Sequence, residues 1–150
     1  MIVSWNDRLI KNGEFALPIS DGVFLRGEGV FETIRAEKGE PCLWGAHFER
    51  LCSSAKKLGL KVPDEGRLLE SVRRVIEANE LGSARVRLTL GEGCLVSAGE
   101  LPEETSEIHV VTSSCPVNEL SPLAQVKCTS YAENMILLRE SGVDEVIRPN

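Results

Sequence analysis

The sequence predicts an α+β fold in which a small N-terminal domain is followed by the start of a larger one. Alternating apolar residues typical of strands occur at residues 29–36, 84–90 and 108–112. Between them, apolar residues recur at helical spacing in residues 46–58 and again from about residue 64. Residues 113–122 carry two prolines and several turn-forming residues, which is typical of a linker.

The first elements are predicted to be strands joined by tight turns. Residues 2–5 and 8–10 resemble two short strands, because Asn6 and Asp7 between them favour a turn. Residues 29–36 are rich in β-branched and aromatic side chains. A turn at residues 37–40 and a partner strand at residues 42–44 would complete a hairpin.

Two amphipathic helices are predicted next. Gly59 ends the first, whose apolar face carries Phe48, Leu51, Cys52, Ala55 and Leu58. The second begins near Asp64 and is expected to stop at Gly82, and its apolar face carries Leu68, Leu69, Val72, Val75 and Ile76. The strands at residues 84–90 and 108–112 are then expected to lie in one sheet.

The last segment is predicted to begin a second domain with a strand, a helix and a strand. Ser130 precedes Glu133 by three residues, the spacing of a capping box, so a helix is expected from there to about Glu140. Residues 144–147 are typical of a short strand. The predicted organisation is a small α+β domain at residues 1–112, a linker at 113–122 and the incomplete start of a larger domain at 123–150.

Composition excludes several classes of function. The chain has 150 residues and a formal net charge of -6 at pH 7, so a broad positive surface for nucleic acid or anionic lipid is not expected. No stretch reaches the roughly 18 apolar residues of a membrane span, and no N-terminal leader is visible, so we expect a cytoplasmic protein. The five cysteines are scattered without a C-x-x-C motif, so neither a disulfide framework nor a metal site is expected.

Lys127 is the first candidate for chemistry. It lies between the apolar residues Val126 and Cys128, just before the last predicted helix. Burial in such surroundings lowers the pKa of an ammonium group and frees its lone pair to form an imine. A lysine that extends to solvent from the edge of a strand would show the same pattern, so the sequence leaves both interpretations open.

Basic residues form the second group of candidates. His47 and Arg50 are three residues apart on a predicted helix, so they share a face from which Arg50 could bind a phosphate. Arg85 and Arg87 point to the same side of a predicted strand and need a carboxylate, a phosphate or water as partner. A solvated helix face and an outer sheet face would explain both pairs without any function.

Four segments occur in a characteristic order along the chain. They are SDGVFLRGEGVFETIRA at residues 20–36, HFERLCSSAKKLGL at 47–60, ARVRLTLGEG at 84–93 and SPLAQVKCTSYAENMILLRESGVDEVIRPN at 121–150. In this order they resemble the class IV pyridoxal-phosphate aminotransferases, a family that includes branched-chain and D-amino-acid aminotransferases and aminodeoxychorismate lyases. The resemblance implies a fold-type IV enzyme, a homodimer, with the cofactor in the cleft between a small and a large domain.

The resemblance also implies roles for individual residues. Lys127 matches the lysine that forms the internal aldimine with pyridoxal 5'-phosphate and later moves the proton, and Arg50 matches an arginine that holds the cofactor phosphate. Tyr131 lies near a position that contacts the phenolic oxygen of the cofactor in some members. Positions on the substrate side are matched by Phe31, Thr33, Arg35, Arg85 and Arg87. No residue here matches the carboxylate that contacts the ring nitrogen.

Departures from the family pattern bear on the function. Arg26 replaces a residue that is commonly aromatic, and if it faces the cleft it joins the other arginines in favouring an anionic substrate. The chain is shorter than the family's usual length and lacks an extended stretch before the Lys127 segment. We therefore expect an aminotransferase or aminodeoxychorismate lyase-like enzyme that acts on a small anionic amino acid or an amino-cyclohexadiene carboxylate. The alternative is an incomplete, non-catalytic half-module that needs a complementary chain.

Overall fold

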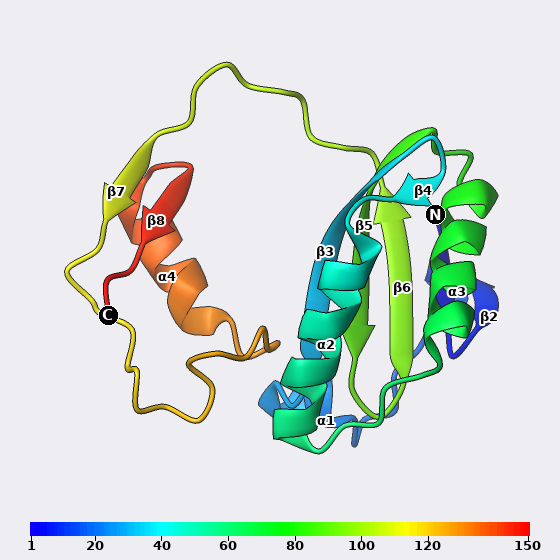
Figure 1. Ribbon diagram of the computed structural model, residues 1–150, viewed down its shortest axis with the longest axis horizontal. Coiled ribbons are helices and arrows are strands. Elements are labelled where there is room, and N and C mark those ends of the chain that lie inside the picture. The colour runs from blue at the N-terminus through cyan, green and yellow to red at the C-terminus, as the bar shows by residue number, and fades with distance from the viewer.

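The computed structural model describes residues 1–150 and shows two parts joined by an extended segment (Figure 1). The first part is built on a six-stranded antiparallel sheet with the strand order β2-β1-β6-β5-β3-β4. Its strands are β1 (Ile2–Trp5), β2 (Arg8–Lys11), β3 (Val30–Glu37), β4 (Glu40–Pro41), β5 (Ser83–Leu90) and β6 (Cys94–Gly99). Its helices are the 3-10 turn η1 (Asn12–Glu14), α1 (Gly22–Arg26), α2 (Trp44–Leu58) and α3 (Glu65–Ala78). The predicted α+β class is confirmed.

Two-residue turns form two of the three hairpins of this sheet, β1–β2 and β3–β4. Asn6 and Asp7 both adopt positive φ, of 49° and 66°, the geometry of the two-residue turn that matches the twist of paired strands. Lys38 and Gly39 do the same between β3 and β4. The first hairpin is as predicted, but the second pairs β3 with residues 40–41 instead of 42–44, because α2 already begins at Trp44.

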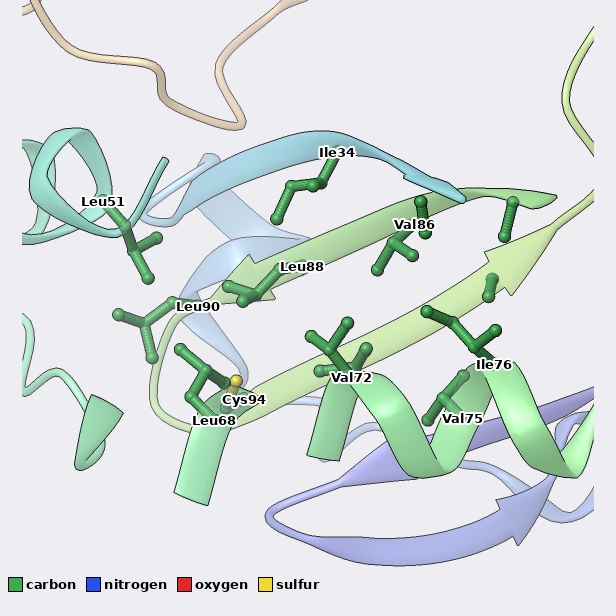
Figure 2. Packing of buried hydrophobic residues seen from close by; sticks show 14 of the residues in the cluster. Ile34, Leu51, Leu68, Val72, Val75, Ile76, Val86, Leu88, Leu90 and Cys94 are labelled. Atoms are coloured by element: carbon green, nitrogen blue, oxygen red, sulfur yellow. The ribbon is translucent and has the colours of Figure 1, made fainter. Parts of the chain in front are cut away.

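Helices α2 and α3 cover one face of the sheet and enclose the core (Figures 1 and 2). Leu51 of α2 and Leu68 and Ile76 of α3 are each at most 2% exposed and face alternate residues of the central strands. The sheet contributes the apolar residues Val30, Ile34, Ala36, Ala84, Val86, Leu88, Leu90, Cys94, Val96 and Ala98. The α2 prediction is confirmed, and α3 ends at Ala78, short of the expected stop at Gly82.

The other face of the sheet carries the alternate residues of β3 and β5. Thr33 lies opposite Arg87, and Arg35 lies opposite Arg85, in the antiparallel register of the two strands. These four side chains are exposed, whereas Phe31 at the start of β3 is buried. The alternation thus divides β3 into a core-facing set and a polar set on the open face.

The second part is smaller. Strand β7 (Val110–Thr112) pairs in parallel with β8 (Glu145–Ile147), and α4 (Ala132–Ser141) packs beside β8 (Figure 1). The prediction that residues 108–112 join the same sheet as residues 84–90 is therefore wrong. The chain passes from the first sheet to the second in the extended segment between Gly99 and Val110. The division into domains at residues 1–112 and 123–150, with a linker at 113–122, stays a prediction.

Local expectations around α4 are met only in part. The helix is present, but Tyr131 is its N-cap and no side chain caps it, so the predicted capping box is wrong. The Ser130 hydroxyl instead donates to the carbonyl oxygen of Gly27 at 3.2 Å. No strand precedes Lys127, since residues 122–125 form turns and a single bridge joins Cys128 to Val30. Strand β6 and helix α1 were not predicted.

None of the helices combines the length and the apolar composition that crossing a membrane requires.

Candidate functional site

The backbone around Lys127 is attached to the first strand residues of β3. The Phe31 amide donates to the Lys127 carbonyl oxygen at 2.9 Å, and the Thr129 amide donates to the Gly29 carbonyl oxygen at 2.8 Å. This edge of β3 is free to pair because β4 contacts only Ala36 and Glu37 at the opposite end. Lys127 therefore lies at the junction between the two parts of the molecule.

The Lys127 side chain is half-buried over an aromatic ring. Its Nζ lies 4.5 Å from the centroid of the Phe31 ring. Burial lowers the pKa of the amine below its ordinary value of 10.5; the nearby Glu32 carboxylate opposes this shift, and the charges of Arg50 and Arg87 add to it. A larger fraction of this lysine is thus neutral, and nucleophilic, than of an exposed lysine at the same pH.

Phe31 is the point at which several predicted site residues meet. Phe31 is 5% exposed. The Arg87 guanidinium carbon lies 3.8 Å from its centroid, and the Tyr131 ring meets it edge to face with centroids 5.7 Å apart. Burial also lowers the pKa of Arg87, with Tyr131 opposing and Arg85 adding to the shift. Arg87 of β5 is thus brought together with Lys127 and Tyr131 of the segment that leads into α4.

Glu32, on the core side of β3, binds Arg50, a contact that was not predicted from the sequence. The Arg50 Nε donates to Oε1 of Glu32 at 2.7 Å and its Nη2 donates to Oε2 at 2.5 Å. His47 Nδ1 lies 2.8 Å from the same Oε2, and it must carry the hydrogen because an ionised carboxylate only accepts. The Glu32 side chain is 2% exposed, whereas that of Arg50 is 53% exposed.

The charge state of this cluster follows from its hydrogen bonds. Burial alone would raise the pKa of Glu32, but the hydrogen bonds from Arg50 and His47 outweigh it and hold that pKa below its ordinary value. The Glu32 carboxylate in turn raises the pKa of Arg50. Glu32 is therefore an ionised carboxylate inside the sheet, next to the strand residues predicted for the site.

The remaining predicted residues fall into two groups. Thr33, Arg85 and Arg87 line an open hollow of about 380 Å³ on the uncovered sheet face, together with Met1, Ser97, Ala98 and Gly99. Arg85 and Arg87 form no ion pair with any carboxylate of the chain. They are therefore two guanidinium groups of this face without a carboxylate partner.

Arg26 and Arg35, by contrast, are already paired. Arg26 donates through Nε and Nη2 to both oxygens of Glu28 at 2.7 Å. Arg35 donates to Glu37 at 2.7 Å and lies 3.6 Å from Glu104. Neither residue lines the hollow. Arg35 lies opposite Arg85 in the register of β3 and β5, but its guanidinium is bonded to Glu37, as that of Arg26 is to Glu28.

Comparison with known proteins gives one family. Residues 29–147 match the family described as amino-transferase class IV. The chain is 28% identical to a bifunctional aminodeoxychorismate lyase / D-amino acid transaminase of Mycobacterium tuberculosis, over 98% of the chain and 60% of that protein. It is 33% identical to the aminodeoxychorismate lyase of Bacillus subtilis, over 93% of the chain and 54% of that protein. The chain thus spans less than two thirds of these relatives.

Solved structures agree with this result. A hypothetical aminotransferase from M. tuberculosis in its PLP-bound form has a TM-score of 0.83 and 26% identity, covering 99% of this chain and 61% of that one. A fold IV-transaminase from Curtobacterium pusillum has a TM-score of 0.77 and 32% identity, covering 94% of this chain and 57% of that one. The alignment with the first M. tuberculosis relative extends over 179 positions, more than the 150 residues of the chain, so that relative carries inserted segments.

Proposed function

Because the chain belongs to the class IV aminotransferase family, we propose that it is the lysine-bearing part of a pyridoxal-phosphate-dependent enzyme, with Lys127 as its reactive amine. One observation carries the proposal. A half-buried amine with a lowered pKa lies over Phe31, within electrostatic range of Arg50 and Arg87. A lysine that only extends to solvent from a strand edge would place its amine in water and not over a buried ring.

The residues present fit the cofactor. Bound pyridoxal phosphate supplies an aldehyde for an amine and a ring that withdraws electrons from the substrate. Lys127 Nζ is the nucleophile for that aldehyde, and when free it takes and returns a proton at the substrate carbon. Arg50 Nη1 has no partner in the chain and is available to a phosphate of about -1.5 to -2 charge. Tyr131, edge-on to Phe31, borders the same space.

The arginines at the hollow support an anionic substrate. Arg85 and Arg87 lie together at the hollow without carboxylate partners, so they suit a small anionic amino acid, its keto acid or an amino-cyclohexadiene carboxylate. Arg26 and Arg35 contribute less than the sequence suggested, because Glu28 and Glu37 neutralise them. Amino transfer to a keto acid and release of pyruvate without an amino acceptor would distinguish a transaminase from a lyase. A cytoplasmic homodimer remains part of this proposal.

Covalent capture tests the proposal directly. The protein is incubated with pyridoxal phosphate, reduced with borohydride, digested and mapped by mass spectrometry. We expect the label on Lys127 and its loss in Lys127→Ala. Lys57→Ala is the matched control, because Lys57 Nζ lies 3.4 Å from Gln125 Oε1, close to the same segment. Labelling spread over surface lysines, or unchanged in Lys127→Ala, would contradict the proposal.

A second candidate is a half-module that is active only with a complementary chain. The observation that favours it is the weak packing of the second part, where α4 has no buried residue. Several of its apolar side chains are exposed: Val110, Val111, Met135, Ile136 and Ile147. Steady-state turnover by the purified 150-residue chain would rule this candidate out.

A further inference from the structure

We propose that Glu32 is a positioning residue: its buried carboxylate orients the Arg50 guanidinium so that the Nη1 edge is presented to a bound phosphate. This inference rests on the proposed function. It concerns a residue that neither contacts the reactive amine directly nor faces the open side of the sheet.

The geometry of the pair leaves one edge of the guanidinium free. Glu32 takes the Nε and Nη2 edge of Arg50 through both carboxylate oxygens. No group of the chain binds Nη1. A long side chain that is 53% exposed would otherwise sample several rotamers, and a two-point contact with a fixed carboxylate removes that freedom.

Glu32 is itself fixed, which a positioning role requires. Its backbone lies within β3, and its Oε2 is shared between Arg50 Nη2 and His47 Nδ1 at 2.5 and 2.8 Å. His47 and Arg50 are one helical turn apart on α2, so the carboxylate ties the strand to the helix. The guanidinium is therefore oriented relative to β3, the strand to which the Lys127 segment is attached.

Packing alone does not explain a glutamate at this position. Its neighbours on the core face of β3 are Val30, Ile34 and Ala36, all apolar and at most 1% exposed. A buried ion pair is often no more stabilising than a well-packed apolar residue of similar volume. A carboxylate at this site is better explained by what it does to Arg50 than by its contribution to the core.

An electrostatic role and a positioning role of Glu32 predict opposite changes in phosphate binding when the carboxylate is removed. Glu32 partly neutralises Arg50, so a purely electrostatic view predicts tighter phosphate binding in Glu32→Gln. Loss of orientation predicts weaker phosphate binding in the same variant, despite its more positive site. The sign of the effect therefore separates the two explanations.

Two probes isolate the phosphate contribution. Lys127 is captured by borohydride reduction with pyridoxal phosphate and, separately, with pyridoxal, which has the aldehyde but no phosphate. The ratio of the two capture efficiencies reports how well the phosphate is held. Any change in the reactivity of the Lys127 amine, or in the folded fraction, affects both probes equally and cancels in the ratio.

We expect the ratio to fall about tenfold or more in Glu32→Gln, as when a carboxylate that orients a metal-binding side chain is lost. Glu40→Gln is the matched control, because it removes the carboxylate of an exposed bidentate pair with Arg73 and leaves the site intact. A ratio in Glu32→Gln that equals or exceeds the wild-type ratio would overturn the inference.

The proposal and its premise fail in different ways. The proposed function is overturned if Lys127 is not labelled in the wild-type protein, or if Arg50→Ala has the same capture ratio as the wild type. If Lys127 is labelled and the ratio falls in Arg50→Ala but not in Glu32→Gln, only the inference about Glu32 is overturned. If Glu32→Gln does not fold, Glu32→Asp keeps the charge and withdraws the carboxylate from Arg50. The same fall is then expected, and an unchanged ratio in the folded Asp variant overturns the inference.

Discussion

The two parts of the molecule differ sharply in how they bury apolar surface. In the first part, α2 and α3 enclose one face of a six-stranded sheet, and sixteen residues form one buried apolar cluster. In the second part, two three-residue strands and α4 enclose almost nothing, and α4 has no buried residue. Most of the folding free energy therefore resides in the first part.

This difference explains how Lys127 is held. Lys127 belongs to the segment that leads into the weakly packed part, but its backbone is bonded to β3 of the well-packed part. The Phe31 ring beneath its amine, and Glu32 and Arg87, whose charges act on it, also belong to the sheet. The well-packed first part thus supplies the environment of the Lys127 amine, and the segment that leads into the second part supplies the amine itself.

The largest expected effect comes from a matched pair of isoleucines on helices. Ile76 on α3 is 1% exposed, whereas Ile136 on α4 is 46% exposed. Ile76→Ala should lower the free energy of unfolding by about 2–5 kcal/mol through lost burial and the cavity left behind. Ile136→Ala should change it by less than about 0.5 kcal/mol. Urea unfolding followed by circular dichroism measures both.

The outcome would decide whether the comparison holds. Equal losses from the two substitutions would mean that α4 is packed against something that stabilises it in solution, such as a second copy of the chain. In that case the loss from Ile136→Ala should grow with protein concentration, because association stabilises the folded state by mass action.

Local sequence patterns predicted most of the first part, and pairing over long distances explains the errors. Helices α2 and α3 and strands β3 and β5 follow from periodicity and turn residues, which are local signals. The partner of a strand is not a local property. Residues 110–112 alternate too weakly to specify a sheet, and they pair with residues 145–147 across an intervening helix.

The site divides in a similar way. Alternation along β5 predicted that Arg85 and Arg87 share a face, and the family resemblance assigned Thr33 to the substrate side with them. Glu32 was missed because its importance depends on α2 crossing the core face of β3, where Arg50 and His47 meet it. A carboxylate at a core-facing strand position, with a later helix carrying a basic pair one turn apart, was the available signal.

The pairing of the other two arginines was also visible in the sequence. Arg26 and Arg35 each precede a glutamate by two residues, Glu28 and Glu37, and each pair is bonded at 2.7 Å. Residues two apart on a strand point to the same side, which makes the Arg35 pair predictable. Such local neutralisation distinguishes Arg26 and Arg35 from Arg85 and Arg87, which have no carboxylate partner.

Helix capping gives a test of intermediate size. The Asp64 side chain accepts a hydrogen bond from the Arg67 amide at 3.0 Å and caps α3, whereas no side chain caps α4. Asp64→Ala should cost about 1 kcal/mol of unfolding free energy. Ser130→Ala should cost about 0.5 kcal/mol or less, because its exposed hydroxyl bonds Gly27 and not the helix. A larger loss from Ser130→Ala than from Asp64→Ala would mean that attachment of the second part contributes more stability than capping of the first.

The smallest expected effect is a gain in stability at the junction itself. Burial lowers the pKa of Lys127 from its ordinary value of 10.5, so between the lowered value and 10.5 the unfolded chain binds more protons than the folded chain. Stability therefore rises with pH through that window, and the penalty for holding the ammonium is present in full below it. Lys127→Met, which fills similar space without a charge, should raise the unfolding free energy at pH 7 by about 0.5–1 kcal/mol.

The pH dependence of that gain identifies its cause. The advantage of Lys127→Met over the wild type should shrink as the pH approaches 10.5, whereas Lys56→Met, on the exposed face of α2, should change stability by less than about 0.5 kcal/mol at pH 7. Urea titrations across this pH range measure both. If Lys127→Met is less stable than the wild type at pH 7, the Lys127 amine stabilises the attachment of the second part and does not destabilise the fold. A gain would mean that the junction keeps a destabilising lysine, which a role in chemistry explains and a role in folding does not.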